Sequence, residues 1–428
     1  MKKAISAMLF MVVLFSTTAL GRREDERHRE RERERQRRGE GGDRFRDLEP
    51  RKPKELFRSE GGQIEEWTAD EYQALQDADM AAAKITLNPR GLVLPLYIDN
   101  HAIKVVVAGT ARMGLVLPWG DRGIERYVYR VQKGDVIAVP RGVPTWWYND
   151  GKERTEIVGI ADTTSGEQPG LVKPFFLVGG QEGQYGSILR GFDREILARA
   201  WDVDEQTVTR LLEDQKGAAI VQVREGIELP EVTEGENTYF ANFVYRAKRS
   251  EADVRVERGG KLQVVNRYKL PVLRHLDLGM TCVKLEPNAM KAPGWSLNAH
   301  NVIYIVRGSG RIQIVRHNGE QALDTEVREG SLVVVPRSFP CAEIAGSDGL
   351  DYVSVSTADT PLGEFLAGRN SVYKGIPLEV VARSFNIDDD LERKIRERRT
   401  EEAIILPPRS GREHRRRRGD EDEPRYVA

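Results

Sequence analysis

The feature of this sequence that most constrains its fold is an internal repeat. The segment KGDVIAVPR at residues 133–141 matches EGSLVVVPR at 329–337, an offset of about 196 residues. Two further pairs of segments match in the same order, namely 105–109 with 304–308 and 195–201 with 379–385. Three matches in one order indicate a duplicated unit. The 428 residues are therefore expected to fold as two similar domains.

Between the two charged ends of the chain, short β-branched runs alternate with Gly, Pro, Asn and Asp. This pattern is typical of an antiparallel β architecture rather than of alternating strands and helices. The clearest predicted strands are 105–107, 135–139, 302–306 and 332–335. The fold class predicted is mainly β.

A pair of helices is predicted at the end of each repeat. The predicted segments are 194–201 after an Asp193 N-cap, Asp204 to about Leu212, and, in the second copy, 376–385 and 390–398. In the first of them, Ile196, Leu197, Ala200 and Trp201 are predicted to form one buried stripe. Because such helices extend away from a barrel, we expect them to need a partner surface.

The two ends of the chain differ from the part between them. Residues 1–21 combine a short basic start, an apolar middle and small residues at the exit, which predicts a cleaved secretory signal peptide. Their apolar run is shorter than the roughly 20 residues that a membrane span needs, and no membrane association is expected. Residues 22–46 are nearly all Arg and Glu, and both this segment and the charged tail 409–428 are predicted to be disordered.

Charge and cysteine usage narrow the function classes. The 66 Lys and Arg are offset by 67 Asp and Glu, so the net charge is only -1 and nucleic acid is not an expected partner. Cys282 and Cys341 are the only cysteines. A disulfide between them stays open, and two free buried thiols are the favoured interpretation.

The pattern Gly-x-x-x-x-x-Pro occurs twice, at 134–140 and 330–336, and resembles the second conserved motif of the cupin superfamily. Over about residues 47–408 the chain resembles more closely the legumin-type (11S) seed storage globulins. The segments that carry this resemblance are 48–50 (LEP), 59–67 (SEGGQIEEW), 91–95 (GLVLP), 191–198 (GFDREILA), 252–254 with 259–262 (ADV, GGKL) and 295–311 (WSLNAHNVIYIVRGSGR).

This resemblance implies two cupin jelly-roll barrels, or double-stranded β-helices, related by a pseudo-dyad and each followed by a helical arm. It also implies a non-catalytic nutrient reservoir, held in a protein storage vacuole of a seed or spore, whose arms join neighbours into a homotrimer. The implied domains are 47–225 for the N-terminal barrel and its arm, 226–252 for a linker, and 253–408 for the C-terminal barrel and its arm.

Enzymatic relatives of this fold, such as germins, hold manganese or iron with three His and a Glu, a set that suits those metals. The corresponding positions here are about Pro95, Tyr97, Ala102 and Thr145 in the first repeat, and about Gly294, Ser296, Asn301 and Cys341 in the second. Neither repeat keeps even two ligands, so no catalytic, cofactor-binding or metal-binding residue is expected. His101 and His300, each just before a strand, are not expected to act as a metal ligand or a base, and a packing or hydrogen-bonding role is expected for His300.

Two other interpretations stay open. The aromatic run Trp146-Trp147-Tyr148 is favoured as core filling, although it could line a ligand cleft in a barrel mouth. A secreted cupin that binds a small molecule or serves in defence is therefore the alternative function, with a metal-dependent oxidase less favoured.

The chain departs from the legumin pattern at the linker. Legumin-type precursors are usually cut at an Asn-Gly followed closely by a cysteine that bonds back across the cut, whereas this chain has Asn237-Thr238 and no cysteine before Cys282. The pair of disulfides that the resemblance implies is therefore missing. Cleavage near Asn237, and the hexamer that follows it, are accordingly not implied for this chain.

Overall fold

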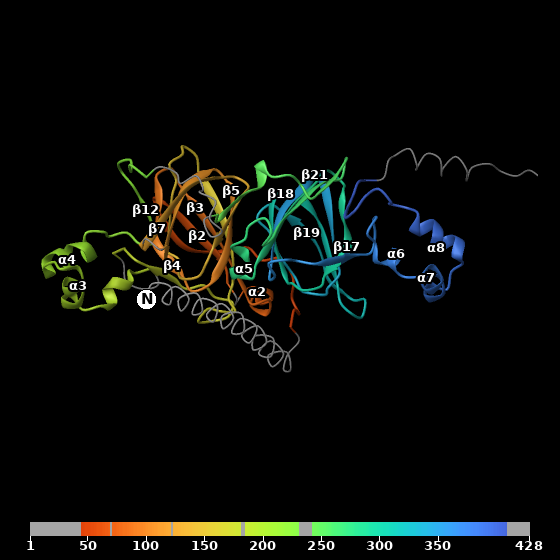
Figure 1. Ribbon diagram of the computed structural model, residues 1–428, viewed down its shortest axis with the longest axis horizontal. Helices are drawn as coiled ribbons and strands as arrows, with labels where there is room; N and C mark the ends of the chain where they lie inside the picture. The colour runs from red at the N-terminus through yellow and green to blue at the C-terminus, as the bar shows by residue number, and fades with distance from the viewer. Residues whose placement is uncertain (1–43, 69–70, 121–122, 181–184, 231–241, 409–428) are drawn as a thin grey trace, which may run out of the picture. The chain divides into compact units, whose positions relative to one another are not determined.

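The computed structural model describes residues 44–68, 71–120, 123–180, 185–230 and 242–408 (Figure 1). The predicted signal peptide 1–21, all but the last three residues of the Arg/Glu-rich segment 22–46, the linker around Asn237 and the tail 409–428 lie outside these residues. Within them, the structure contains no helix that is both long and apolar enough to cross a membrane.

The first barrel is built from two antiparallel sheets. In spatial order, the first sheet contains β1 (Lys54–Ser59), β2 (Gly62–Trp67), β3 (Met80–Leu87), β10 (Thr155–Asp162), β5 (His101–Ala108), β8 (Asp135–Val139) and β13 (Val244–Arg246). The second contains β11 (Pro174–Phe176), β4 (Gly91–Ile98), β9 (Thr145–Tyr148), β6 (Thr110–Gly120) and β7 (Gly123–Gln132), with β12 (Ile220–Gln222) paired to β4.

The second barrel repeats this plan in a single connected sheet. Its strands are β14 (Val254–Val256), β15 (Gly260–Val265), β16 (Gly279–Leu285), β17 (Met290–Ser296), β18 (Asn301–Val315), β19 (Gln321–Arg328), β20 (Leu332–Val335), β21 (Cys341–Ser356), β22 (Gly363–Phe365) and β23 (Ile405–Leu406). The order β14-β15-β16-β21-β18-β20 matches β1-β2-β3-β10-β5-β8 of the first barrel. The predicted mainly β fold with two similar barrels is confirmed, and all four predicted strands lie inside observed ones.

A glycine in each barrel explains why the repeat matches at 105–109 and 304–308. Gly109 separates β5 from β6, and Gly308 lies inside β18, with positive φ angles of 74° and 82°. A Cβ at Gly109 would lie 2.4 Å from the carbonyl oxygen of Arg154, and one at Gly308 would lie 2.1 Å from that of Gly349. Only glycine fits here, because the left-handed conformation and the close backbone approach both exclude a side chain. The chain can therefore pass from β5 in one sheet of the first barrel to β6 in the other, and bend within β18 at the equivalent place of the second.

Each barrel is followed by a pair of helices that lies outside it (Figure 1). The first pair is α3 (Arg194–Trp201) and α4 (Glu205–Glu213), and the second is α7 (Leu378–Phe385) and α8 (Asp389–Arg396), preceded by α6 (Val372–Gly375). Asp204 caps α4 by accepting a hydrogen bond from the Thr207 N–H at 2.6 Å, and Asp388 caps α8 in the same way. The predicted helices are confirmed, except that the Asp193 side chain makes no capping bond.

The segment leading into each barrel pairs with a strand of the other barrel. β13 precedes the second barrel and lies antiparallel to β8 of the first, with Tyr245 opposite Val136. Reciprocally, Arg51 precedes the first barrel and forms an antiparallel bridge with Leu332 of β20. Val136 and Leu332 are equivalent positions of the repeat. This exchange covers both outer strands, and it explains why β8 and β20 are continuous apolar runs that are buried along their whole length.

Other contacts fix the same junction. The Tyr72 hydroxyl, just before α2 (Gln73–Asp77), accepts a hydrogen bond from the Val334 N–H of β20 at 3.0 Å and donates one to the Leu48 carbonyl at 3.3 Å. The Trp67 ring meets the Tyr304 ring edge to face, with 5.9 Å between the centroids. These contacts join the two barrels through buried groups.

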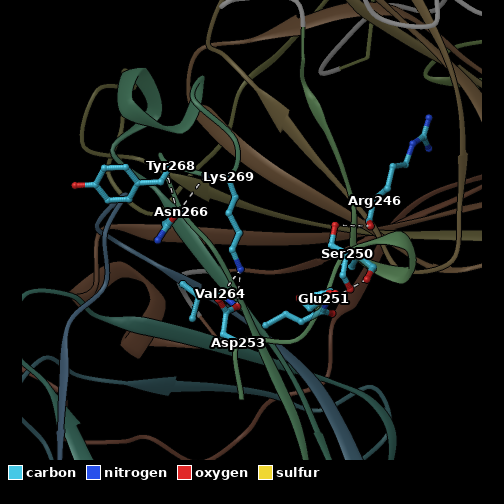
Figure 2. A network of polar contacts seen from close by, with 10 residues as sticks. Arg246, Ser250, Glu251, Asp253, Val264, Asn266, Tyr268 and Lys269 are labelled. Carbon is cyan, nitrogen blue, oxygen red and sulfur yellow. Dashed lines mark hydrogen bonds and ion pairs between the residues drawn. The ribbon is translucent and has the colours of Figure 1, made fainter. Parts of the chain in front are cut away.

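Polar contacts hold the chain where it enters the second barrel (Figure 2). The Lys269 ammonium pairs with both Asp253 carboxylate oxygens at 2.6 and 2.7 Å, and the same carboxylate accepts a bond from the Val264 N–H. The Ser250 hydroxyl donates to the Arg246 carbonyl at 3.0 Å. Part of the predicted linker 226–252 is thus ordered as β13 and the short helix η2 (Ala247–Arg249), while 231–241 lie outside the described residues.

Candidate functional sites

The positions that hold metal ligands in enzymatic cupins are occupied by other residue types in this chain. In the first barrel Thr145 is buried opposite Leu96, and Ala102 lies on the neighbouring sheet. In the second barrel Gly294 lies directly opposite Cys341. Across the described residues, no group of three or more His, Cys, Asp or Glu side chains is placed to hold a metal ion.

The two histidines occupy equivalent positions and make equivalent contacts. His101 Nδ1 accepts a hydrogen bond from the Arg141 N–H at 3.2 Å, and His300 Nδ1 accepts one from the Arg337 N–H at 3.0 Å. Each arginine directly follows the proline of the repeated motif. Both histidines therefore hold the turn after that proline in place by a hydrogen bond, and for His300 this agrees with the packing or hydrogen-bonding role predicted for it.

The aromatic run on β9 belongs mainly to the core. Trp147 and Tyr148 are buried, and Trp147 lies opposite Val93 on one side and Met113 on the other. The core interpretation is therefore confirmed for these two residues. The Trp147 ring has one unexpected neighbour, because the Lys104 ammonium lies 5.2 Å from its centroid.

Both cysteines are free thiols. Burial raises the pKa of Cys282 to about 12. Cys341 is buried beside Glu343, and burial together with this carboxylate raises its thiol pKa well above the ordinary value. Because the thiolate is the reactive form, neither residue has the environment of a nucleophile or redox centre.

A buried ion pair lies next to Cys341 in the second barrel. Lys291 and Glu343 are cross-strand partners on β17 and β21, and Lys291 Nζ lies 2.8 Å from Glu343 Oε1. The Glu343 side chain is 1% exposed. Burial opposes the charge on Lys291, but the carboxylate holds the lysine pKa above its ordinary value. In the second barrel the partly buried Lys291, whose side chain is 23% exposed, is thus neutralised by a buried carboxylate of the neighbouring strand.

The first barrel contains a buried lysine without such a carboxylate. Lys104 lies on β5 and is 8% exposed. Among the described residues no carboxylate lies within ion-pair distance of its ammonium, and burial lowers its pKa from 10.5 to about 8. Lys104 was not predicted from the sequence as a site residue. The signal was present as a single charged residue within the apolar strand AIKVVVA.

Lys104 lines a cavity of about 110 Å³ inside the first barrel. The other lining residues include small side chains on β3 and β10, apolar residues of β4, and the polar groups of Glu66 and Tyr185. Burial raises the pKa of Glu66 to about 7, and the buried Tyr185 hydroxyl has no hydrogen-bond partner in the described structure. Most of the residues that line the cavity are therefore apolar, with Lys104, Glu66 and Tyr185 among the polar ones.

The helical arms present apolar side chains to the surface. Leu197 and Ala198 of α3 pack against Val208 and Leu212 of α4. The prediction of a buried stripe is correct for Leu197 and wrong for its other three members, since Ile196 is 52% exposed, Trp201 is 43% exposed and Ala200 is also exposed. The reason is that, among the described residues, the cluster formed by α4 and Leu189 covers only the face of α3 that carries Leu197 and Ala198.

The second arm shows the same arrangement. Its exposed apolar residues are Val380, Phe385, Leu391 and Ile395. The Arg396 guanidinium donates to the Lys374 and Ile376 carbonyl oxygens at 3.1 and 2.9 Å, which holds α8 against the segment before α7. Each arm is thus a fixed helix pair with an uncovered apolar face.

Comparison with known proteins places this geometry among characterised families. A family model described as Cupin matches residues 48–209 and 248–393. The 11S globulin seed storage protein 2 of Sesamum indicum is 29% identical over 421 residues, covering 85% of this chain and 92% of that protein. Cocosin 1 of Cocos nucifera is 30% identical over 416 residues, covering 86% of this chain and 89% of that protein.

Solved structures give the same result. The coconut allergen cocosin superposes with a TM-score of 0.79 at 32% identity, covering 85% of this chain and 99% of that one. Pumpkin seed globulin superposes with a TM-score of 0.79 at 29% identity, covering 86% and 100%. The similarity therefore extends across both barrels and both arms.

Proposed function

Because this chain belongs to the 11S globulin seed storage proteins of the cupin family, we propose that it is stored as a ring-shaped homotrimer built through its helical arms. It is a storage protein, and its relatives are non-catalytic storage globulins. Proteins of this family oligomerise. The proposal concerns the number of subunits and the surface that joins them.

The observation that carries the proposal is the pair of uncovered apolar faces. α3 exposes Ile196 and Trp201, and the arm on the other barrel exposes Phe385 and Ile395. Large side chains exposed on short helices favour association, because covering them stabilises the assembly by roughly 25 cal/mol per Å² buried. One arm of each chain can pack on the other arm of the next, and such a head-to-tail contact closes into a ring when the rotation allows it.

Native mass spectrometry of the wild type and of Ile196→Asp tests this arrangement. The wild type is expected at three times the chain mass and the variant mainly at the mass of one chain, because an aspartate cannot be buried unpaired in the contact. Gln206→Asp is the matched control, since it adds the same charge at an exposed polar position of the same arm. Trimeric Ile196→Asp, or a Gln206→Asp variant that dissociates equally, would contradict the proposed surface.

We also propose a domain organisation and a route to the storage vacuole. The mature chain is expected to start after residue 21, with a barrel and arm at 47–225, a linker at 226–252 and a barrel and arm at 253–408. The chain stays uncut near Asn237, and both of its cysteines are free, so no disulfide would hold the two parts together after cleavage. N-terminal sequencing and denaturing electrophoresis of protein purified from storage vacuoles test these points, and a second N-terminus near residue 238 would refute the uncut chain.

A further inference from the structure

Lys104 lies in the interior of the first barrel, where a charged group needs a partner. The strand registers place Lys104 opposite Gly159, Gly159 opposite Ala83, and Ala83 opposite Glu66. These four residues form one row across β5, β10, β3 and β2, and all four line the cavity. Lys104 and Glu66 therefore project to the same face from the ends of the row, with two small residues between them.

The two ends of this row are too far apart for a direct ion pair. Three strand spacings separate the backbones of Lys104 and Glu66, a distance of roughly 14 Å at about 4.8 Å per strand. Burial is the cause of the pKa shift of each group, with no contribution from the other. The Lys104 ammonium lies over the face of the Trp147 ring, and Lys104 is also one of the residues that line the cavity. A ligand in the cavity is therefore in contact with the Lys104 side chain.

The equivalent row of the second barrel carries different residues. The equivalent of Lys104 is Ile303, and the residues that follow along its row are Ser354, Thr281 and Val264 in place of Gly159, Ala83 and Glu66. Lys291 of that barrel lies on β17 instead, is only partly buried, and is paired with Glu343 at 2.8 Å. Only the first of the two rows therefore contains a buried lysine without a carboxylate partner, with the small residues Gly159 and Ala83 beside it.

The cavity has the character of a site for a small organic anion. An apolar cavity of about 150 Å³ accommodates benzene, so a volume of about 110 Å³ fits a somewhat smaller molecule. Its walls include Ile64, Ile85, Leu96, Ile98 and Ile157, which suit a hydrocarbon body. A buried cation is satisfied best by an anion that also hydrogen-bonds to it.

We propose that the interior of the first barrel binds a small apolar monocarboxylate, with the carboxylate on the Lys104 ammonium and the hydrocarbon chain over Ala83 and Gly159. Butyrate is a suitable probe, because its four carbons match the size of the cavity and it carries a single charge. Glu66 and Tyr185 also line the cavity, and the Glu66 carboxylate, at the other end of the row from Lys104, disfavours a second carboxylate on the ligand. This ligand site is separate from storage and from the arm surfaces.

Isothermal titration calorimetry of the purified full-length protein with sodium butyrate tests the proposal. One site per chain is expected in the wild type. Lys104→Ile, which installs the residue of the second barrel, is expected to bind about 10- to 100-fold more weakly because a charge-assisted hydrogen bond is lost. Butyramide has nearly the same shape without the charge, and it is expected to bind the wild type more weakly by a similar factor.

Lys84→Ile is the matched control. Lys84 is the neighbour of Ala83 on β3, and its ammonium lies 3.1 Å from Glu156 rather than against the cavity. This variant is expected to bind butyrate as the wild type does. Equal affinities for butyrate and butyramide, unchanged binding by Lys104→Ile, or equal losses in the two lysine variants would each overturn the proposal, as would the absence of binding to the wild type.

Discussion

Replacing Lys104 by isoleucine is expected to stabilise the ligand-free protein. Burial lowers the pKa of Lys104 from 10.5 to about 8, and a shift of one unit corresponds to about 1.36 kcal/mol. The charged lysine therefore costs the folded state about 3 kcal/mol at neutral pH, to order of magnitude. Ile303 occupies the equivalent position in the second barrel, so the fold accommodates isoleucine there. The stacking of the ammonium on Trp147 offsets part of the gain.

The stability difference between the variant and the wild type is expected to depend on pH. Below about pH 8 Lys104 is protonated in both the folded and the unfolded chain, and the full cost applies. Between about pH 8 and 10.5 the folded protein releases the proton while the unfolded chain keeps it, so wild-type stability rises with pH relative to the variant. Above 10.5 both states are neutral and the cost disappears. The other titratable groups at the cavity, Glu66 and Tyr185, are common to both proteins.

Urea unfolding at pH 7 and at pH 10.5, followed by tryptophan fluorescence, measures the effect. The difference in free energy between variant and wild type is compared at each pH, so that shared contributions cancel. Lys104→Ile should be more stable by about 3 kcal/mol at pH 7, and the difference should shrink at the higher pH. A variant less stable than the wild type at pH 7, or a difference that does not change with pH, would refute the claim that Lys104 is an unpaired buried cation.

Three further outcomes follow from buried polar groups. Lys291→Met should destabilise the protein by about 3 to 5 kcal/mol in the same urea assay, because Glu343 is left buried without its partner; the double variant with Glu343→Leu should recover most of the loss, and failure to recover would contradict the ion-pair explanation. Tyr72→Phe should cost about 1 to 3 kcal/mol, since a buried N–H of β20 loses its acceptor; an unchanged unfolding midpoint would argue against this contact. In native protein at pH 8, Cys282 and Cys341 should react with a thiol reagent far more slowly than after denaturation, because their thiol pKa values are raised; equal rates would show that the thiols are accessible.

Much of the fold could be predicted because its signals are local or repeated. The runs at 135–139 and 332–335 are strands with the same neighbours in each barrel. Asp204 begins α4 as its residue type suggests. Gly109 and Gly308 mark the bend of each barrel because no other residue fits there. In each of these cases the residue type alone indicates the local structure that it needs.

The sites were harder to predict because their signals depend on distant neighbours. The stripe on α3 follows helical periodicity, but periodicity does not say which face α4 covers, and Ile196 is exposed as a result. Lys104 and Lys291 also differ in what lies opposite on the neighbouring strand, which is Gly159 for Lys104 and Glu343 for Lys291. Strand register determines which residue lies opposite each lysine, and the register cannot be predicted from the pattern of residues within either strand.

β13 pairs with β8 over three residues, and Arg51 forms a single bridge with Leu332. The outer strand of each barrel is therefore contacted by a segment that leads into the other barrel. If one half were produced alone, β8 or β20 would lose this contact and present a more open sheet edge, and such an edge favours pairing with a strand of another molecule. Joining the two repeats in one chain thus protects both edges from association with other molecules.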